Sequence, residues 1–294
     1  MAGYIIYNGY WNADSLPNPV IHLLNAAEQR GINLIPFANT ETAVEFDGKL
    51  SIPDFDVSDF ALFWDKDVRL ARAMETIGIR LYNSADTVAV CDDKAATHIK
   101  LAAEDIPMPK TIVAPMTYVH MDEKPSQYFL NRAATIMGFP MVVKECFGSL
   151  GGQVYLAHDM DELKLLTDKM AARPFICQQF IKANAGTDIR IYIVDGQPVA
   201  AMRRRSETDF RANVGNGGMA EKYVPSAEQK ELAVRCCNIL GALFAGVDIL
   251  IGDEGEPLVC EVNSNAHMQA ISACSGVDVA GAIIDSVLAR ERQR

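Results

Sequence analysis

Three oxygen-bearing side chains near the end of the chain have the spacing of a metal site. Glu261 and Asn263 lie two residues apart in the run PLVCEVN, so on a strand they point to the same face. Asp248 interrupts the apolar run FAGVDILI and can join them across a hairpin turned at GDEGE. Oxygen ligands without nitrogen or sulfur suit Mg²⁺, which completes its shell with waters and substrate phosphates. The pattern therefore predicts nucleotide-bound Mg²⁺, and solvated polar residues on a hairpin are the alternative.

A lysine followed by a glycine-rich turn forms a second candidate. In VVKECFGSLGGQVYL, Lys144 ends a β-like run, and a serine and several glycines follow it: Gly148, Ser149, Gly151 and Gly152. Glycines allow backbone amides to approach an anion closely. The turn is neither a Walker A motif nor the Rossmann Gly-x-Gly-x-x-Gly motif. It indicates an anion-binding loop, with a plain hairpin turn as the alternative.

A third group consists of arginines mixed with acids and amides. Its members are Asp188, Arg190, Arg203, Arg204, Arg205, Asp209, Arg211 and Asn213. On a strand Arg203 and Arg205 share one face while Arg204 takes the other, so one face can bind phosphate or carboxylate. A solvated edge strand is the alternative. That alternative fits Arg204 and Arg205 better than Arg190, Arg203 and Arg211.

Composition and charge narrow the class of protein. The 294 residues are 49% hydrophobic and 22% charged, as in an ordinary globular protein. The formal net charge of −11 repels phosphate backbones and anionic lipid, so we expect neither nucleic acid nor a membrane as a partner. Seven cysteines without Cys-x-x-Cys spacing and five scattered histidines indicate a reducing compartment and argue against zinc. With no basic signal-peptide start, we expect a cytoplasmic protein, whose oligomeric state, including a homo-oligomer, stays open.

The elements that must position these residues fall into three segments. Residues 1–88 alternate short apolar runs with helical ones, which predicts a small α/β unit with a parallel sheet. Residues 89–179 follow as an α+β unit, preceded from residue 85 by a helical stretch in which Asp92 and Asp93 occupy a first turn. Residues 180–294 hold two expected hairpins, turned at Asp195-Gly196 and at GDEGE, and a final helix over 279–292. The predicted fold class is mixed α/β and α+β.

The order of these features resembles the ATP-grasp superfamily, and most closely the RimK-type glutamate ligases. The matching segments are Asp93-Lys94 opening a helix, VVK with its glycine-rich loop, QQFI, DIR, DFRANVGNGG, GVDIL and EVN. The resemblance runs from about residue 85 to the C-terminus, and the first segment resembles the family only in architecture. It implies an ATP-grasp fold with an N-terminal parallel α/β domain over 1–88, a central lid domain over 89–179 and a C-terminal antiparallel-sheet domain over 180–294.

The resemblance also implies a reaction. The family phosphorylates a carboxylate with ATP, and an amine then attacks the acyl phosphate, releasing ADP and phosphate. We therefore expect a carboxylate–amine ligase that joins an amino acid such as glutamate to an amine of a peptide, protein or small molecule. Its cofactors are ATP and two Mg²⁺ ions, with Mn²⁺ as a substitute. A non-catalytic ATP-binding module is the alternative, and the presence of Lys94, Lys144, Arg211 and the metal residues together argues against it.

Individual roles follow from the same resemblance. The implied ATP-binding residues are Lys94, Lys144, Gly148, Ser149, Gly151, Gly152, Gln178, Gln179, Phe180, Ile181, Asp188, Arg211 and Asn213. The implied metal ligands are Asp248, Glu261 and Asn263. The implied catalytic residues are Lys144, Arg203 and Arg211. The implied substrate contacts are Arg190, Arg203, Asn265 and His267.

This chain departs from the family pattern at two places. The first is Gln179, where RimK-type enzymes commonly have an acid, and much of the adenine contact there is made by the backbone. The second is the run Ser264-Asn265-Ala266-His267, where the family has a Ser-Pro-Gly turn after the metal-binding asparagine. The second departure alters the wall near the acceptor of the acyl group.

Overall fold

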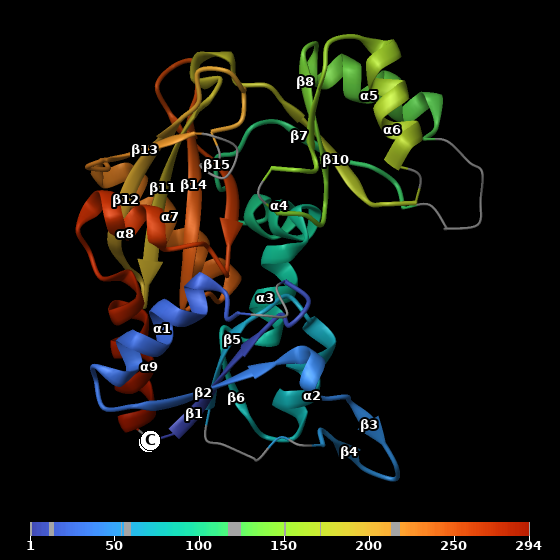
Figure 1. Cartoon of the computed structure of the whole chain (residues 1–294). Helices are drawn as coiled ribbons and strands as arrows, with labels where there is room; N and C mark the ends of the chain where they lie inside the picture. The colour runs from blue at the N-terminus through green and yellow to red at the C-terminus, as the bar shows by residue number, and fades with distance from the viewer. Residues whose placement is uncertain are drawn as a thin grey trace.

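The computed structural model describes residues 2–11, 15–53, 55, 60–116, 125–149, 151–170, 172–212 and 218–293. Within these ranges the strands form three main sheets and one short hairpin. Figure 1 shows the sheets as separate layers, the first in blue, the second in green and the third in yellow to orange. Helices α3 (Ala85–Asp92) and α4 (Lys94–Ala102) lie between them. The arrangement confirms the predicted mixed α/β and α+β fold class.

The first sheet is parallel, with the strand order β2-β1-β5-β6. Its strands are β1 (Ala2–Tyr7), β2 (Asn33–Ala38), β5 (Phe60–Trp64) and β6 (Arg80–Tyr82). Helices α1 (Asn18–Glu28) and α2 (Val68–Thr76) lie in crossovers between parallel strands. Every residue of β5 is buried, as expected for a strand covered on both faces. The sequence analysis did not predict the 3-10 turn η1 (Asn39–Glu41) or the small hairpin of β3 (Glu45–Phe46) and β4 (Leu50–Ser51).

The second sheet is antiparallel, with the strand order β7-β10-β8-β9. Its strands are β7 (Thr111–Val113), β8 (Met141–Glu145), β9 (Val154–Ala157) and β10 (Phe175–Gln179). Helices α5 (Gln127–Met137) and α6 (Met160–Met170) pack on it and share an apolar core with its strands. The helical stretch expected from residue 85 is divided at Asp93, whose carboxylate accepts the backbone N–H groups of Ala95 and Ala96 at 2.9 and 3.2 Å. A new helix, α4, therefore begins at Lys94.

The third sheet is antiparallel, with the strand order β13-β12-β11-β14-β15. Its strands are β11 (Thr187–Val194), β12 (Gln197–Arg205), β13 (Met219–Lys222), β14 (Phe244–Ile251) and β15 (Pro257–Asn263), and the short turn η2 (Lys182–Asn184) precedes them. Helix α7 (Ala227–Leu240) covers one face through a core that includes Ile191 and Val247. Both predicted hairpins, β11 with β12 and β14 with β15, are present.

The first and third sheets share one apolar core. It joins Ile5 and Leu23 from the beginning of the chain with Phe244 and Ile283 from its end. Helix α9 (Val279–Arg292) lies beside α1, as Figure 1 shows, and Arg30 of the first segment donates to Asp285 at 2.6 Å. The first segment is therefore fixed to the third by packing as well as by chain connection. The boundaries at residues 88 and 179 stay predictions.

The last two helices fold back on the molecule. Helix α8 (Gln269–Ser275) contacts β12 and β13, while α9 contacts β11, β12 and α1. No single helix among the described residues is long and apolar enough to cross a membrane. In the described ranges one pair of helices, α8 and α9 taken together, has the length and composition of a span, and the chain bends by 107° between them.

Asn83 provides a test of this shared packing. Its buried amide donates to the carbonyl oxygens of Phe244 at 2.9 Å and Ser264 at 3.3 Å, and accepts the N–H of Leu243 at 2.8 Å. We expect Asn83→Ala to lower the free energy of unfolding by about 3 kcal/mol, because it leaves buried backbone groups without partners. Urea denaturation measures the change. The control is Asn25→Ala on the exposed side of α1, and equal midpoints for the two variants would contradict the prediction.

Candidate functional site

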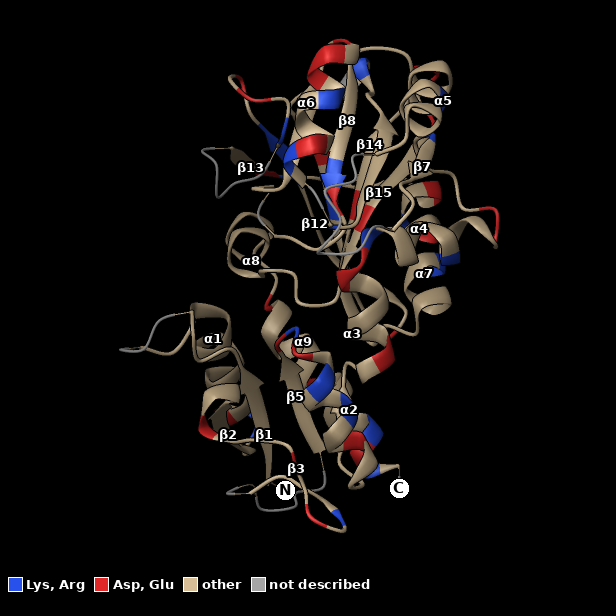
Figure 2. Cartoon of the chain, turned by 90° about the vertical axis from the view of Figure 1, so that its right-hand side faces the viewer, with Lys and Arg blue, Asp and Glu red and all other residues tan. Residues whose placement is uncertain are grey.

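One face of the third sheet gathers the charged residues expected from the sequence. Residues directly opposite each other in an antiparallel sheet share a face. The register pairs Asp188 with Arg204, Arg190 with Asp248, Asp248 with Glu261, and Gly246 with Asn263. Figure 2 shows acidic and basic segments of this sheet side by side where it approaches α4. All three proposed metal ligands are therefore on one face, beside two arginines.

Asp248 is the most enclosed acid of this face. Its side chain is 5% exposed, and both carboxylate oxygens accept from Arg190 at 2.6 Å. Nη2 of Arg204 lies 2.9 Å from Oδ2 of Asp248. Burial opposes ionisation, but the two guanidinium groups hold the pKa of Asp248 below its usual value. Gly246 leaves room for Ala266, since a Cβ there would lie 2.6 Å from the Ala266 Cβ.

Arg204, and not Arg203, belongs to the site. Arg204 is buried and binds both oxygens of Asp188 at 2.6 Å, whereas Arg203 pairs with Glu221 at the surface. The assignment of Arg203 as a catalytic and substrate residue was therefore wrong, and Arg204 was missed.

A β-bulge explains this exchange. Starting from the pair Val194 and Gln197, uninterrupted pairing would place residue 203 opposite residue 188. The register shifts between Tyr192 and Ile193, next to Pro198, which has no N–H to donate to the sheet. The shift by one residue turns Arg203 to the other face and brings Arg204 opposite Asp188. The proline near the hairpin turn was the signal that could have revealed it.

Two buried lysines connect the third sheet to the rest of the molecule. Lys94 at the start of α4 lies 3.2 Å from Glu261 and donates to the carbonyl of Gly148 at 3.4 Å. Lys144 on β8 donates to the sulfur of Cys260 at 3.4 Å. Burial raises the pKa of Glu261, but the positive charges of Lys94, Lys144 and Arg190 together leave the pKa lowered. The two phosphate-binding candidates thus meet the proposed metal strand.

The glycine-rich turn is held from two sides. Lys66 of the first segment donates to the hydroxyl of Ser149 at 3.0 Å, and Arg211 donates to the carbonyl of Gly151 at 2.7 Å. Gly151 has a φ of 74°, which favours glycine. Asp209 holds the Arg211 guanidinium, with one bond of 2.7 Å, and raises its pKa. Residue 150 lies outside the described residues, as does Asn213.

The expected adenine hinge contains a hydrogen-bond chain that the sequence analysis missed. The amide nitrogen of Gln178 donates to Nε2 of His98 at 2.9 Å and to the hydroxyl of Thr111 at 3.0 Å. Nδ1 of His98 then donates to the carbonyl of Lys94 at 2.8 Å. Burial, with help from the charge of Lys144, lowers the pKa of His98 to about 4, so the ring is neutral. The Gln178 side chain therefore supports Lys94, and contact with adenine through its backbone stays a prediction.

The rest of the hinge lies where the second sheet meets the third. The N–H of Gln179 donates to the carbonyl of Lys110 at 2.8 Å, and Ile181 is buried. The Phe180 ring packs edge-on against Phe210, with ring centroids 6.1 Å apart. These contacts join the hinge to the segment after β12 that carries Arg211. Their role toward a nucleotide stays a prediction.

The segment Ser264–His267, which departs from the family pattern, follows the proposed metal strand β15 and faces the first sheet. The amide nitrogen of Asn265 donates to the backbone carbonyl of Asp65 at 2.8 Å. His267 is exposed, and partial desolvation together with the charge of Arg190 lowers its pKa. Asn265 therefore connects the metal strand to the first segment, a contact the sequence did not predict.

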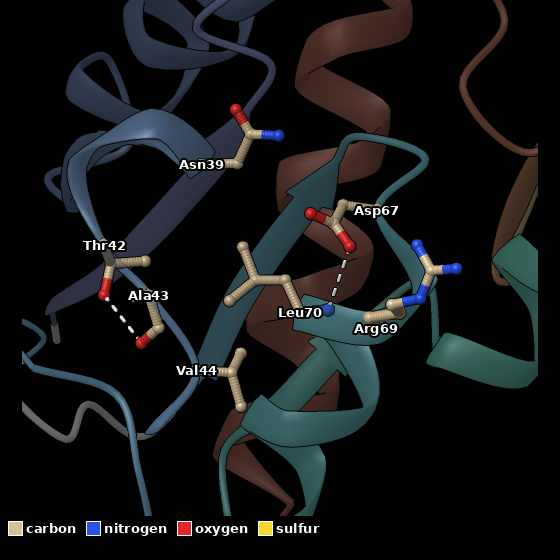
Figure 3. A pocket seen from close by; sticks show the side chains of 7 residues that line it. All are labelled: Asn39, Thr42, Ala43, Val44, Asp67, Arg69 and Leu70. Carbon is tan, nitrogen blue, oxygen red and sulfur yellow. Dashed lines mark hydrogen bonds between the residues drawn. The ribbon is translucent and has the colours of Figure 1, made fainter. Parts of the chain in front are cut away.

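A separate hollow in the first segment contains none of the expected site residues. It has a volume of about 290 Å³ and is lined by Asn39, Thr42, Ala43, Val44, Asp67, Arg69 and Leu70. Figure 3 shows the Asp67 carboxylate accepting the N–H of Leu70, at 3.0 Å, as the cap of α2. We assign the hollow no function because its acid is committed to this cap.

The donor set of β14 and β15 fits a hard cation. Among the described residues no group of three or more His, Cys, Asp or Glu side chains is arranged for a metal, so a site here depends on the amide as well. A metal would take the side-chain oxygen of Asn263, while its side-chain nitrogen, buried without a partner in the described part of the chain, would be free to donate to an acceptor such as a phosphate oxygen. Glu261 supplies an ionised carboxylate on the same face, and Asp248 supplies a second one once Arg190 shifts.

Comparison with known proteins agrees with this geometry. A family model described as RimK-like ATP-grasp domain matches residues 91–287. A probable alpha-L-glutamate ligase of Trichodesmium erythraeum is 31% identical over 280 residues, covering 90% of this chain and 89% of the relative. Beta-citrylglutamate synthase B of Danio rerio is 34% identical over 227 residues, covering 76% of this chain and 54% of the relative. The solved RimK domain protein ATP-grasp from Sphaerobacter thermophilus has a TM-score of 0.75 at 24% identity, covering 97% of this chain and 98% of that chain.

The fold and the site define an ATP-binding ligase of the ATP-grasp class. More specifically, the chain belongs to the RimK-like ATP-grasp family. The relatives compared above include ligases that form C–N bonds. The resemblance stated from the sequence is thereby confirmed. The chain spans about half the length, 54%, of the Danio rerio synthase.

The neighbouring arginines give a matched pair of variants. We expect Arg204→Met to lower the free energy of unfolding by about 4 kcal/mol, because it leaves two buried carboxylates without their shared cation. Arg203→Met removes an exposed ion pair and should cost less than ~1 kcal/mol. Chemical denaturation of both variants measures the difference. Equal losses would show that the bulge-shifted register is wrong.

Proposed function

We propose that this protein is an ATP- and Mg²⁺-dependent carboxylate–amine ligase that acts through an acyl phosphate and releases ADP and phosphate. The supporting observation is the meeting of cations from the second and third segments on one face of the third sheet. Lys94, Lys144, Arg190 and Arg204 face three carboxylates, those of Asp188, Asp248 and Glu261. The four cations exceed these acids by one charge, which suits a polyphosphate brought with its metal ion.

The chain's own groups can stabilise phosphoryl transfer. Such transfer depends mainly on positioning and on stabilising charge at the transferring oxygens. Lys144 contacts only a thiol in the described structure, and burial raises the pKa of that Cys260 thiol, so the ammonium can turn to a phosphate. Arg211 donates a hydrogen bond to the carbonyl oxygen of Gly151 in the glycine-rich turn. Closure of this turn over the nucleotide would keep water from the labile acyl phosphate.

Glu261, Asn263 and Asp248 are the residues we propose to hold Mg²⁺. We propose two ions, with Mn²⁺ as a substitute, since both ions accept oxygen ligands. When bound, the metal neutralises charge on the phosphate oxygens. Before it binds, Arg190 and Lys94 keep Asp248 and Glu261 ionised in a buried place.

The substrates are proposed from the relatives. Their names, an alpha-L-glutamate ligase and a beta-citrylglutamate synthase, both include glutamate. We therefore propose an amino acid such as glutamate as one substrate, joined to a peptide, protein or small molecule through an amide bond. A cytoplasmic location is also a proposal, which the free state of all seven cysteines supports.

The products test the reaction class. Purified protein is incubated with Mg-ATP and a pool of amino acids and small carboxylic acids, and the nucleotides are separated by chromatography. We expect ADP and phosphate to appear together with an amide product detected by mass spectrometry. Formation of AMP and pyrophosphate would overturn the acyl-phosphate route.

Glu261 tests the metal assignment. We expect Glu261→Gln to lower ADP formation by at least roughly 100-fold, because it removes a charged oxygen ligand and the partner of Lys94. Glu254→Gln, an identical exchange in the exposed turn of the same hairpin, should leave the rate unchanged. The steady-state rate of ADP release is measured for both. Equal activity of Glu261→Gln and the unsubstituted protein would exclude Glu261 as a ligand.

A further inference from the structure

The C-terminal edge of the first sheet is a place where ligands bind in folds of this kind. From β1 the chain crosses to β2 on one side, while β5 pairs on the other side. Open parallel sheets bind ligands outside the carboxyl ends of their strands at such a switch point. The residues that follow β1 and β5 here are Asn8 and Asp65. The side-chain nitrogen of Asn8 donates to Oδ1 of Asp65 at 3.1 Å.

One carboxylate oxygen of Asp65, Oδ1, accepts hydrogen bonds, whereas no described donor reaches the other, Oδ2. Its side chain belongs to a residue only 5% exposed, and Oδ1 also accepts the backbone N–H of Lys66 at 2.7 Å. Oδ2 is buried, and no donor among the described residues reaches it. Burial raises the pKa of Asp65 despite these hydrogen bonds. A buried carboxylate oxygen without a donor costs free energy unless a ligand supplies one.

A second unsatisfied acceptor comes from the third sheet. The Asn265 nitrogen donates to the Asp65 backbone carbonyl at 2.8 Å, which fixes the orientation of the amide because a carbonyl needs a donor. Oδ1 of Asn265 is then buried without a partner in the described part of the chain. Both spare atoms, Oδ2 of Asp65 and Oδ1 of Asn265, are acceptors, and one carries negative charge. A cationic donor with several N–H groups fits this pair, whereas an anion does not.

The position of this pair relative to the phosphate-binding elements fits a substrate. Lys66, next to Asp65, donates to Ser149 of the glycine-rich turn at 3.0 Å. Asn265 is two residues beyond Asn263 at the end of the proposed metal strand. A group bound here would therefore lie close to both the turn and the metal strand. It would enter between two segments that the Asn265–Asp65 hydrogen bond joins at this point.

We propose that Asp65 and Asn265 bind the amino group of the amine substrate, an amino acid, in its ammonium form. After the ammonium loses a proton to solvent, the neutral amine attacks the carbonyl carbon of the acyl phosphate, so that the C–N bond forms and phosphate leaves. The proposal rests on the proposed ligase function and adds the residues that select its amine. Asp65 supplies the charge, and Asn265 supplies a second acceptor from the other side. Asn8 and the N–H of Lys66 hold the Asp65 carboxylate in place.

Hydroxylamine separates amine selection from carboxylate activation. It is small and uncharged at neutral pH, so it can trap an acyl phosphate without an ammonium site. In the first assay the protein, Mg-ATP, hydroxylamine and a panel of carboxylic acids that includes L-glutamate yield hydroxamate. In the second assay each of the twenty amino acids replaces hydroxylamine. We expect Asp65→Asn to keep hydroxamate formation and to raise the KM for the amino acid by roughly 30-fold, the loss of one charged hydrogen bond.

The matched control is Asp67→Asn. It removes the same charge two residues away, and asparagine caps α2 as well as aspartate does, so it should change neither assay. Equal loss of both reactions in Asp65→Asn would overturn the proposal, as would an unchanged KM or an equal rise in Asp67→Asn.

A binding measurement keeps the two proposals distinguishable. Absence of hydroxamate with the unsubstituted protein would contradict the ligase function alone. The ammonium site is then decided by calorimetry with the same amino acids and their N-acetyl derivatives, which lack the ammonium group. We expect the unsubstituted protein to prefer a free amino acid over its N-acetyl form and Asp65→Asn to lose this preference. No preference in the unsubstituted protein would overturn the site.

Discussion

The buried carboxylate of Asp248 is the constraint on which the site depends. It lies on β14, a strand with pairing partners on both sides, where an uncompensated charge would be strongly unfavourable. Arg190 and Arg204 compensate it from β11 and β12, and Arg204 also binds Asp188. Because these strands are in fixed register, the arginines cannot be moved by one position without leaving an acid unpaired. The ion pairs of this face therefore require the same strand register as the hydrogen bonds of the sheet.

The same compensation of an acid by a cation extends to the second segment through a lysine. Glu261, opposite Asp248, is paired with Lys94 at the beginning of α4, and α4 begins there because Asp93 caps it. The carbonyl of Lys94 in turn accepts a hydrogen bond from Nδ1 of His98, a neutral ring whose Nε2 accepts from Gln178. Cationic groups on this face therefore come from elements whose positions are set by backbone capping and by strand pairing. The charged groups of this site are thus already gathered on one face, and a metal ion at Asp248 would still require a shift of Arg190.

Much of the fold and the acidic part of the site could be predicted from the sequence. Period-two spacing alone put Glu261 and Asn263 on one face, and the strand register bears this out. Prediction failed where a single residue changes the register or the partner. The bulge near Pro198 exchanged Arg203 for Arg204, and the local sign of this shift by one residue was a single proline near the hairpin turn. The contact between Gln178 and His98 spans 80 residues, and its partners become neighbours only in the folded chain.

The parallel sheet of the first segment was predicted, but its packing against the third segment was not, since its own sequence shows only an alternation of strands and helices. In the structure it shares a core with the last helix, and Asn83 bonds to the backbone of β14 and to Ser264 next to the metal strand. These contacts place the ends of β1 and β5 beside the segment Ser264–His267, which differs from the family pattern. A substitution in that segment therefore alters a contact with the first sheet and not a solvent-exposed surface. On the proposal that this contact binds the amine, differences in the amine would arise from paired changes at the contact, whereas the charged face proposed to bind the nucleotide can stay the same.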